Sequence, residues 1–271
     1  MIFGMKNISS LGDCMYLTPA LQALKGEEHT IEMELGLQSE QVARVFDGLA
    51  KVVFKDNPLP RLYITNQDKT HSAQRVLNSL GIKDRNCIPK IDLTGSEVIW
   101  AKNYLKQYNI NKVIVLVNDN LGGNDKNNPR AHYVRPPIKL MQYITDYLNN
   151  SGYTVLQFGP KLDYWVGNIP TFTPLKGAIH IRNLEIREQA ACFSVAKNMI
   201  CGDSGLSHLN LAVGGKSVVF HPPESTNFGY LFYDLHYLSE LWKNEPVRVK
   251  YIDFTQFNGK MEEIMGFLDG I

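Results

Sequence analysis

The feature that most constrains the fold of this 271-residue chain is the alternation of short apolar runs with amphipathic stretches. Val113–Val117 is a continuous apolar run of the kind that forms a central parallel strand covered on both faces. Strands that alternate with helix-length amphipathic segments are typical of βαβ units and a mainly parallel sheet. The sequence therefore predicts an α/β fold.

A first series of elements occupies the N-terminal part of the chain. A turn is expected at Gly12-Asp13, and Thr18-Pro19 supplies the N-cap and first residue of the next helix. The expected strands are Ile2–Ile8, Thr30–Leu35, Lys51–Phe54 and Arg61–Ile64. The further expected helices are Glu40–Asp47, Ser72–Leu80 and Ser96–Tyr108.

A second series begins at Lys112, so the two series meet near residues 109–112. This predicts two small, doubly wound domains facing a cleft, over residues 1–110 and 111–255, with a C-terminal helix in 256–271 that crosses back to the first domain. Asn118–Pro137 is expected to be a long loop. The other expected elements are strands Thr154–Phe158, Asn198–Cys201 and Ser217–Phe220, and helices Ile138–Asn149, Ile186–Lys197, Leu206–Val213 and Lys260–Leu268.

Charge and targeting signals exclude several classes of protein. Lys plus Arg number 28 and Asp plus Glu 27, which gives a net charge of +1. This charge does not favour binding to nucleic acid, and we expect at most peripheral contact with a membrane. No stretch approaches the ~20 apolar residues of a membrane span, and the N-terminus lacks the pattern of a signal peptide. The four scattered cysteines form no CxxC pair or zinc pattern. We expect a cytoplasmic protein with reduced thiols.

The most specific stretch runs from Met199 to Leu209 and reads as a strand, a glycine-containing turn and a helix N-terminus. Unpaired backbone N–H groups, together with a helix dipole worth roughly half a positive charge, make such a turn suited to a phosphate. Ser204 adds a hydroxyl donor. Asp203 belongs to the same site as an N-cap or loop-orienting carboxylate, because it would repel a diphosphate directly. An ordinary capped helix is the alternative interpretation.

The second stretch, Ser10-Leu11-Gly12-Asp13-Cys14, lies between the first expected strand and the first expected helix. An acidic residue there faces the carboxyl ends of the strands, where open α/β sheets bind ligands. Its carboxylate can act as a general base toward a hydroxyl if its surroundings raise its pKa toward the working pH. A helix-capping Asp is the alternative.

Taken together, these two stretches resemble the signatures of the ADP-heptose:lipopolysaccharide heptosyltransferase family. Gly12–Lys25 is similar to its N-terminal GD…TPALRALK signature, and Gly202–Leu209 to its D-S/T-G-x-x-H-L signature. Pro89–Tyr108 resembles the family's interdomain helix, Val113–Val117 the strand that opens its nucleotide domain, and Gly152–Gly159 the second strand there. The resemblance spans most of residues 8–223.

The resemblance implies a GT-B glycosyltransferase, in which two Rossmann-like domains hold a nucleotide sugar and a glycan or lipid-linked glycan acceptor. Such enzymes invert the anomeric centre and use no metal or other cofactor, and the chain contains no Asp-x-Asp triplet for a metal-bridged diphosphate. By resemblance, Asp13 is the catalytic base, with Gly12 and Ser10 on the acceptor side. The diphosphate turn maps onto Ser204, Gly205 and Leu206, with His208 close by.

Charge on the departing diphosphate is then met by helix-end amides and cationic side chains. The candidates in the loop after the first C-terminal strand are Lys126, Arg130 and Arg135, unless these are solvated loop charges. A packed structural role is the alternative for His208, and Phe228–Tyr233 is either core or lid, or a platform for sugar. Position at strand ends assigns nucleotide recognition to Asn118, Gly159, Arg182, Asp203 and Glu224.

The expected function is transfer of a sugar from a nucleotide diphosphate to a hydroxyl, in lipopolysaccharide or another surface glycan. The N-terminal half is short beside that of full-size heptosyltransferases, and it lacks basic patches for a lipid-linked acceptor. Two alternatives therefore stay open: a transferase that modifies a nucleobase or a protein, and a non-catalytic scaffold that binds nucleotides.

Overall fold

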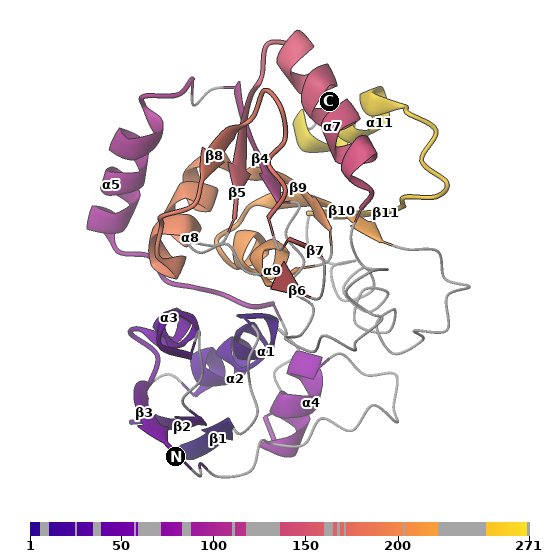
Figure 1. Cartoon of the computed structure of the whole chain (residues 1–271). Helices are drawn as coiled ribbons and strands as arrows, with labels where there is room; N and C mark the ends of the chain where they lie inside the picture. The colour runs from indigo at the N-terminus through magenta and orange to yellow at the C-terminus, as the bar shows by residue number, and fades with distance from the viewer. Residues whose placement is uncertain are drawn as a thin grey trace.

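The computed structural model describes residues 1–5, 11–24, 26–34, 39–56, 58, 72–82, 88–109, 112–117, 136–159, 165–166, 169–170, 172–202, 204–221 and 248–269 (Figure 1). Within them lie a three-stranded and a six-stranded parallel sheet. A short antiparallel ribbon joins β6 (Trp165–Val166) to β7 (Ile169–Pro170). The predicted α/β class is confirmed.

The three-stranded sheet has the order β1-β2-β3, with all pairings parallel. Its strands are β1 (Ile2–Met5), β2 (Thr30–Glu34) and β3 (Lys51–Lys55). The helices of this part are α1 (Leu11–Met15), α2 (Thr18–Ala23), α3 (Ser39–Ala43), a 3₁₀ turn η1 (Arg44–Phe46) and α4 (Ser72–Ser79). The strand expected at Arg61–Ile64 lies outside the described residues.

Two local predictions in this part are wrong. Gly12 and Asp13 lie within α1 and not in a turn. Thr18 does not cap α2, whose N-cap is Leu17; instead the Thr18 hydroxyl donates to the Met15 carbonyl at 2.8 Å. A threonine hydroxyl serves either a helix start or a preceding carbonyl, and here it closes the end of α1.

The six-stranded sheet has the order β11-β10-β9-β4-β5-β8 and is parallel throughout. Numbered within this sheet, the order is 6-5-4-1-2-3, which is the doubly wound arrangement. Its sequence direction reverses between β4 and β9, so a crevice opens there at the carboxyl ends of the strands. The strands are β4 (Val113–Val117), β5 (Thr154–Phe158), β8 (Ile179–Ile181), β9 (Asn198–Gly202), β10 (Lys216–His221) and β11 (Val249–Asp253).

Helices cover both faces of this sheet, as the wholly apolar β4 predicts (Figure 1). Ile114 and Leu116 of β4 pack in one buried cluster with α7 (Ile138–Asn150) and α11 (Met261–Asp269). The alternate residues of β4 pack in a second cluster with α8 (Ile186–Ala196) and α9 (Gly205–Ala212). Side chains of a strand point alternately to the two faces, so β4 anchors both layers.

The C-terminal helix α11, which we expected to return to the N-terminal part, packs on the six-stranded sheet. Lys216 of β10 holds its end, because the Lys216 Nζ donates to the carbonyls of Phe267 and Leu268 at 3.2 and 3.4 Å. A cation at the last carbonyls satisfies groups that have no partner within the helix.

Helix α5 (Gly95–Leu105) packs against α8 and so belongs physically to the second layer of helices. It begins with a capping box, in which Thr94 accepts from the Glu97 amide and Glu97 accepts from the Thr94 amide. Before α5, the Ile91 amide donates to the Ala212 carbonyl of α9 at 3.2 Å. The segment before α5 therefore contacts the second half of the chain through this hydrogen bond.

Candidate functional site

The turn after β9 forms a helix N-terminus at the switch point of the six-stranded sheet. Ser204 is the N-cap of α9 in an extended conformation, with φ −152° and ψ 159°. Its carbonyl accepts from the Ser207 amide at 3.1 Å and from the Ser207 hydroxyl at 2.6 Å. The first amides of a helix have no acceptor within it, and the dipole of α9 favours an anion at this end.

The Ser204 hydroxyl is the polar group that the described residues leave unsatisfied at this turn. It makes no capping hydrogen bond, and its Oγ is buried without a partner among the described residues. A buried hydroxyl without a partner costs about 1–3 kcal/mol. An anionic oxygen seated at the turn would accept from it and remove that cost.

The other residues of the predicted turn take distinct places. Gly205 is the first residue of α9, and Leu206 is half-buried against the core, so its contribution to a ligand is the backbone amide. His208 is buried, with 6% of its surface exposed, and its ring meets that of Tyr16. Asp203 is not the N-cap, since Ser204 holds that position, and Asp203 itself lies outside the described residues.

The two signature stretches of the sequence meet in space. Helix α1, which contains Gly12 and Asp13, packs against α9 (Figure 1). The Asp13 side chain lies outside what the structure describes, but its backbone is thereby placed beside the helix that carries Ser204. Segments separated by about 190 residues in the sequence thus lie side by side.

A second cluster forms at the carboxyl ends of β5 and β8, where Gly159 and Arg182 were assigned to nucleotide recognition. The Gly159 amide donates to the Ile181 carbonyl at 3.1 Å. The Arg182 guanidinium carbon stands 4.7 Å from the centroid of the Phe172 ring. A Cβ on Gly159 would lie 2.2 Å from the Phe172 Cδ2, so only glycine admits the ring. β5 is two strand spacings from β9, about 10 Å, which suits a nucleoside next to its diphosphate.

Phe172 packs with two of the predicted site residues, Gly159 and Arg182, and sequence analysis did not single it out. It stands in an irregular segment before β8, and no periodicity marks it. Gly159 and Arg182 at strand ends were the residues that pointed to this region. That the Phe172 ring lies between them could be known only from the parallel pairing of β5 with β8.

The remaining predicted site residues lie outside the described residues, so the structure does not test them. These are Ser10, Asn118, Lys126, Arg130, Arg135 and Glu224, and the aromatic stretch Phe228–Tyr233 lies outside as well. The loop that holds the three cations leaves β4 at the switch point. Within the described part of the chain, no group of three His, Cys, Asp or Glu side chains could hold a metal ion.

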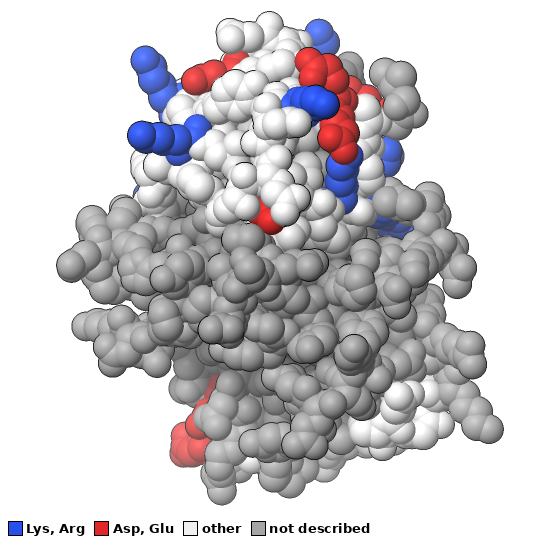
Figure 2. Space-filling view, turned by 90° about the vertical axis from the view of Figure 1, so that its right-hand side faces the viewer, with Lys and Arg blue, Asp and Glu red and all other residues white. Residues whose placement is uncertain are grey.

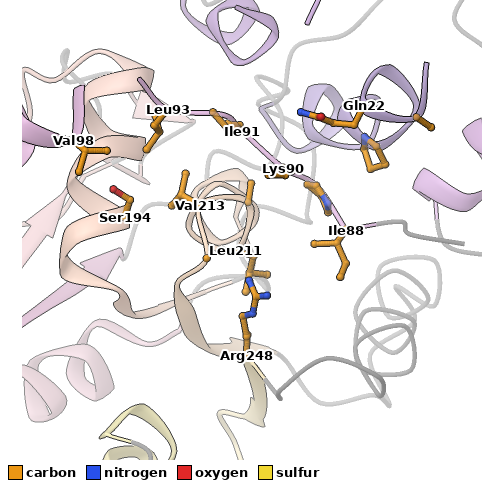
Figure 3. Close-up of a pocket in the computed structure, with 15 residues that line it drawn as sticks. Gln22, Ile88, Lys90, Ile91, Leu93, Val98, Ser194, Leu211, Val213 and Arg248 are labelled. Atoms are coloured by element: carbon orange, nitrogen blue, oxygen red, sulfur yellow. The ribbon is translucent and has the colours of Figure 1, made fainter. Parts of the chain in front are cut away.

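A cavity of about 510 Å³ lies at the other end of α9 (Figure 3). It is lined by the last residues of that helix, by α2 and by the segment 88–93, with Lys90 and Arg248 among its polar side chains. The eight residues of α9 span about 12 Å, which separates this cavity from Ser204. It is therefore distinct from the turn that suits a phosphate.

Arg187 of α8 forms hydrogen bonds that connect the two parts of the chain. It makes two hydrogen bonds to Glu97, at 2.5 and 2.9 Å, and donates to the carbonyls of Asp92 at 3.1 Å and Arg44 at 3.5 Å. The Arg187 hydrogen bond is the main cause that lowers the pKa of Glu97 from 4.5 to about 2. No motif or spacing in the sequence predicted that these residues would meet.

On the described part of the face in Figure 2, acidic and basic side chains are interspersed over α7 and α11, so neither sign of charge dominates there. One such pair is Lys250 with Glu263, at 2.5 Å. No helix among the described residues is both long and apolar enough to cross a membrane.

The strand order defines a doubly wound α/β protein, with the Ser204 turn at its switch point. Scans against protein-family models and against curated proteins find no match to the sequence. Comparison of the fold does find relatives among solved structures. The chain has the fold of the ADP-heptose lipopolysaccharide heptosyltransferases.

Three solved structures illustrate the likeness. The E. coli ADP-heptose lps heptosyltransferase II has a TM-score of 0.60 at 12% identity, over 99% of this chain and 98% of that one. A glycosyl transferase of family 9 from Veillonella parvula DSM 2008 has a TM-score of 0.63 at 14% identity, over 100% and 89%. The E. coli heptosyltransferase WaaC with ADP has a TM-score of 0.54 at 14% identity, over the whole of both chains. At these identities the likeness establishes the fold.

Proposed function

We propose that the protein is a metal-independent, inverting glycosyltransferase of the GT-B type that moves a sugar from a nucleotide diphosphate to a hydroxyl acceptor. The observation that carries the proposal is the Ser204 turn at the switch point, with the Asp13-bearing helix packed against it. The heptosyltransferase fold over the whole chain supports this class, and WaaC was solved with ADP. An ADP-linked heptose, used in lipopolysaccharide or another surface glycan, is the donor that this support favours.

In this proposal the diphosphate is held at the N-terminus of α9. The first-turn amides and the Ser204 hydroxyl donate to its oxygens, and burial strengthens these bonds because water does not compete. The charge that grows on the diphosphate during transfer is then stabilised by groups that are already in place. Lys126, Arg130 and Arg135 are the cations proposed to complete this stabilisation from the loop that leaves β4.

Asp13 is proposed as the general base. Its carboxylate takes the proton of the acceptor hydroxyl as that oxygen forms a bond to the anomeric carbon. The bond from the anomeric carbon to the diphosphate breaks, and its electron pair leaves with the nucleoside diphosphate. Attack opposite the leaving group inverts the anomeric centre. The acceptor side is assigned to the N-terminal part, with Ser10 and Gly12 beside the base.

The nucleoside is proposed to lie toward Arg182 and Phe172. Their stacked guanidinium and ring form a flat edge at the carboxyl ends of β5 and β8, and Gly159 leaves room for them. Flat groups of this kind suit the face of a base. Asn118, Asp203 and Glu224 are further proposed contacts. Residues 1–110 and 111–255 would act as the acceptor and donor domains of a protein that works in the cytoplasm.

The proposal is tested first by donor binding. Thermal shift is measured with ADP-, GDP-, UDP-, CMP- and dTDP-linked sugars, because a ligand at 100-fold its dissociation constant adds about 2.7 kcal/mol of stability. We expect one nucleotide to raise the melting temperature, and Ser204→Ala to weaken that effect. The absence of any shift with the wild-type protein would reject the donor site.

Transfer is tested next with Asp13→Asn. This variant should still bind the donor, yet lose transfer by 100-fold or more, in line with the loss of a general base. Addition of a chelator should leave wild-type transfer unchanged. Unimpaired transfer by Asp13→Asn would reject the mechanism, while binding without transfer in the wild-type protein would favour a non-catalytic nucleotide-binding scaffold.

A further inference from the structure

The ring contact between Tyr16 and His208 joins the two signature stretches. The two ring centroids lie 5.5 Å apart at an interplanar angle of 73°, an edge-to-face arrangement. Tyr16 directly follows α1, and His208 lies in α9, so this contact crosses from one part of the chain to the other. It is one of the contacts by which α1 packs against α9.

His208 lies about one helical turn after Ser204 in α9. His208 follows Ser204 by four residues, and residues so spaced share one face of a helix. Helical side chains lean toward the N-terminus, so a side chain covers the turn that precedes its own Cα. With 6% of its surface exposed and its ring against that of Tyr16, His208 is buried where α9 packs against α1.

Tyr16 is itself held firmly. Cys14 and Met15 before it are fully buried, and the Leu17 amide after it donates to the Cys14 carbonyl at 3.2 Å. The Thr18 hydroxyl donates to the Met15 carbonyl at 2.8 Å, which fixes the link from α1 to α2. Because its backbone is fixed on both sides, the Tyr16 ring presents a rigid surface to His208.

We propose that Tyr16 is a positioning residue of the donor site. Its ring holds the His208 imidazole against the Ser204 turn and sets the separation between α9 and the helix that carries Asp13. The inference rests on the proposed function, since it assigns Tyr16 a role in binding of the nucleoside diphosphate. The contact is one between rings, and Tyr16→Phe keeps the ring.

The test measures affinity by calorimetry for the nucleoside diphosphate, among ADP, GDP and UDP, that binds the wild-type protein most tightly. We expect Tyr16→Ala to weaken binding about 5- to 10-fold and Tyr16→Phe to restore affinity to within twofold. Tyr16→Leu keeps most of the volume without the ring and serves if the alanine variant does not fold. It should weaken binding as the alanine variant does.

Tyr108→Ala is the matched control. Tyr108 is also a half-buried tyrosine in an edge-to-face pair, with Tyr104 at 6.2 Å, but it stands beyond α5 and away from the turn. It should change the melting temperature about as much as Tyr16→Ala and leave affinity for the diphosphate unchanged. Thermal melts of all variants separate a loss of fold from a loss of position.

A double-mutant cycle shows whether Tyr16 acts through His208. If it does, Tyr16→Ala adds less than twofold to the loss already caused by His208→Ala. If the losses of affinity in the two single variants multiplied in the double variant, the positioning role would be overturned. A Tyr16→Leu variant that bound like the wild-type protein would also overturn it. Wild-type protein that bound no nucleoside diphosphate would instead reject the proposed function, and the role of Tyr16 with it.

Discussion

Two serines three residues apart show how one turn divides structural and ligand-binding tasks. The Ser207 hydroxyl donates to the Ser204 carbonyl at 2.6 Å and so belongs to the fold of the turn. The Ser204 hydroxyl is buried without a partner among the described residues. A polar group that the fold leaves unsatisfied is stabilised when a ligand supplies the partner.

Ser204→Ala and Ser207→Ala should therefore have opposite signatures. Loss of the Ser204 hydroxyl removes a hydrogen bond to a charged oxygen, worth about 1.5–3 kcal/mol, so nucleotide affinity should fall tenfold or more while the free energy of unfolding hardly changes. Loss of the Ser207 hydroxyl should lower the free energy of unfolding by about 1 kcal/mol. Calorimetry and urea unfolding measure the two effects. Equal loss of stability in both variants would contradict the assignment of Ser204 to a ligand.

Elements with local sequence signals were predicted well, and those that depend on tertiary pairing were not. Strands β4 and β5 have the predicted bounds because buried apolar runs define them. Strands β8 and β11 were missed because they are the edges of the sheet, and polar or exposed residues such as His180 and Lys250 interrupt their apolar pattern. The expected helix Glu40–Asp47 splits into α3 and a 3₁₀ turn.

The same division holds for the candidate site. The Ser204 turn was predicted because a strand, a glycine turn and a helix start are contiguous in the sequence. The contacts of Tyr16 with His208 and of Phe172 with Arg182 join segments that only the packed fold brings together. No spacing within one element could have revealed them.

One glycine after a strand and one before a strand provide a test at the scale of elements. A Cβ at Gly159 would lie 2.2 Å from the ring of Phe172, which is buried and stacked under Arg182. Gly159→Ala should force the ring and guanidinium to move, at a cost of about 1–3 kcal/mol of stability. We expect nucleotide affinity to fall with it, measured by calorimetry well below the melting temperature.

Gly215→Ala is the control for that experiment. Its Cβ would lie 2.2 Å from Asn210 Oδ1, whose side chain donates at 2.9 Å both to the Lys216 carbonyl and to the Ser217 hydroxyl. The loss of stability should be similar, yet this site is at the far end of α9 from Ser204, so affinity should be retained. An equal loss of affinity in the two variants would mean that Gly159→Ala acts through stability alone.

At the scale of the whole molecule, the two parts of the chain are joined by a continuous buried apolar cluster and by a polar junction around Arg187. The cluster runs from β1 and β2 through α1 and α2 to α8 and α9. At the junction, Arg187 donates to Glu97 of α5 and to the backbone carbonyls of Asp92 and Arg44. Because the guanidinium has partners in three segments, it fixes how they meet.

Arg187→Met should weaken this junction more than it weakens either part. Removal of one partner of a buried ion pair costs about 3–5 kcal/mol, and since the Glu97 side chain keeps 25% exposure we expect the cost here to be about 2–3 kcal/mol. Hydrogen exchange should rise first in η1, the segment 88–93 and the start of α5. Uniform acceleration across both sheets would contradict a local role.

The junction also makes stability depend on pH in a defined window. The pKa of Glu97 is about 2 in the folded protein, against 4.5 ordinarily, chiefly because Arg187 donates to its carboxylate. A carboxyl with a lowered folded pKa adds stability that is complete above about pH 4.5 and is lost as the pH falls toward 2. Urea unfolding between pH 6 and 2.5 should therefore show a steeper loss of stability for the wild-type protein than for Glu97→Gln.

Glu263→Gln is the matched control. The pKa of Glu263 is also lowered, by Lys250, but that carboxyl is fully exposed and solvent screens its pair. We expect the stability of Glu263→Gln to depend on pH as that of the wild-type protein does. The same pH dependence in Glu97→Gln would contradict a contribution of the Arg187–Glu97 pair to stability in this window.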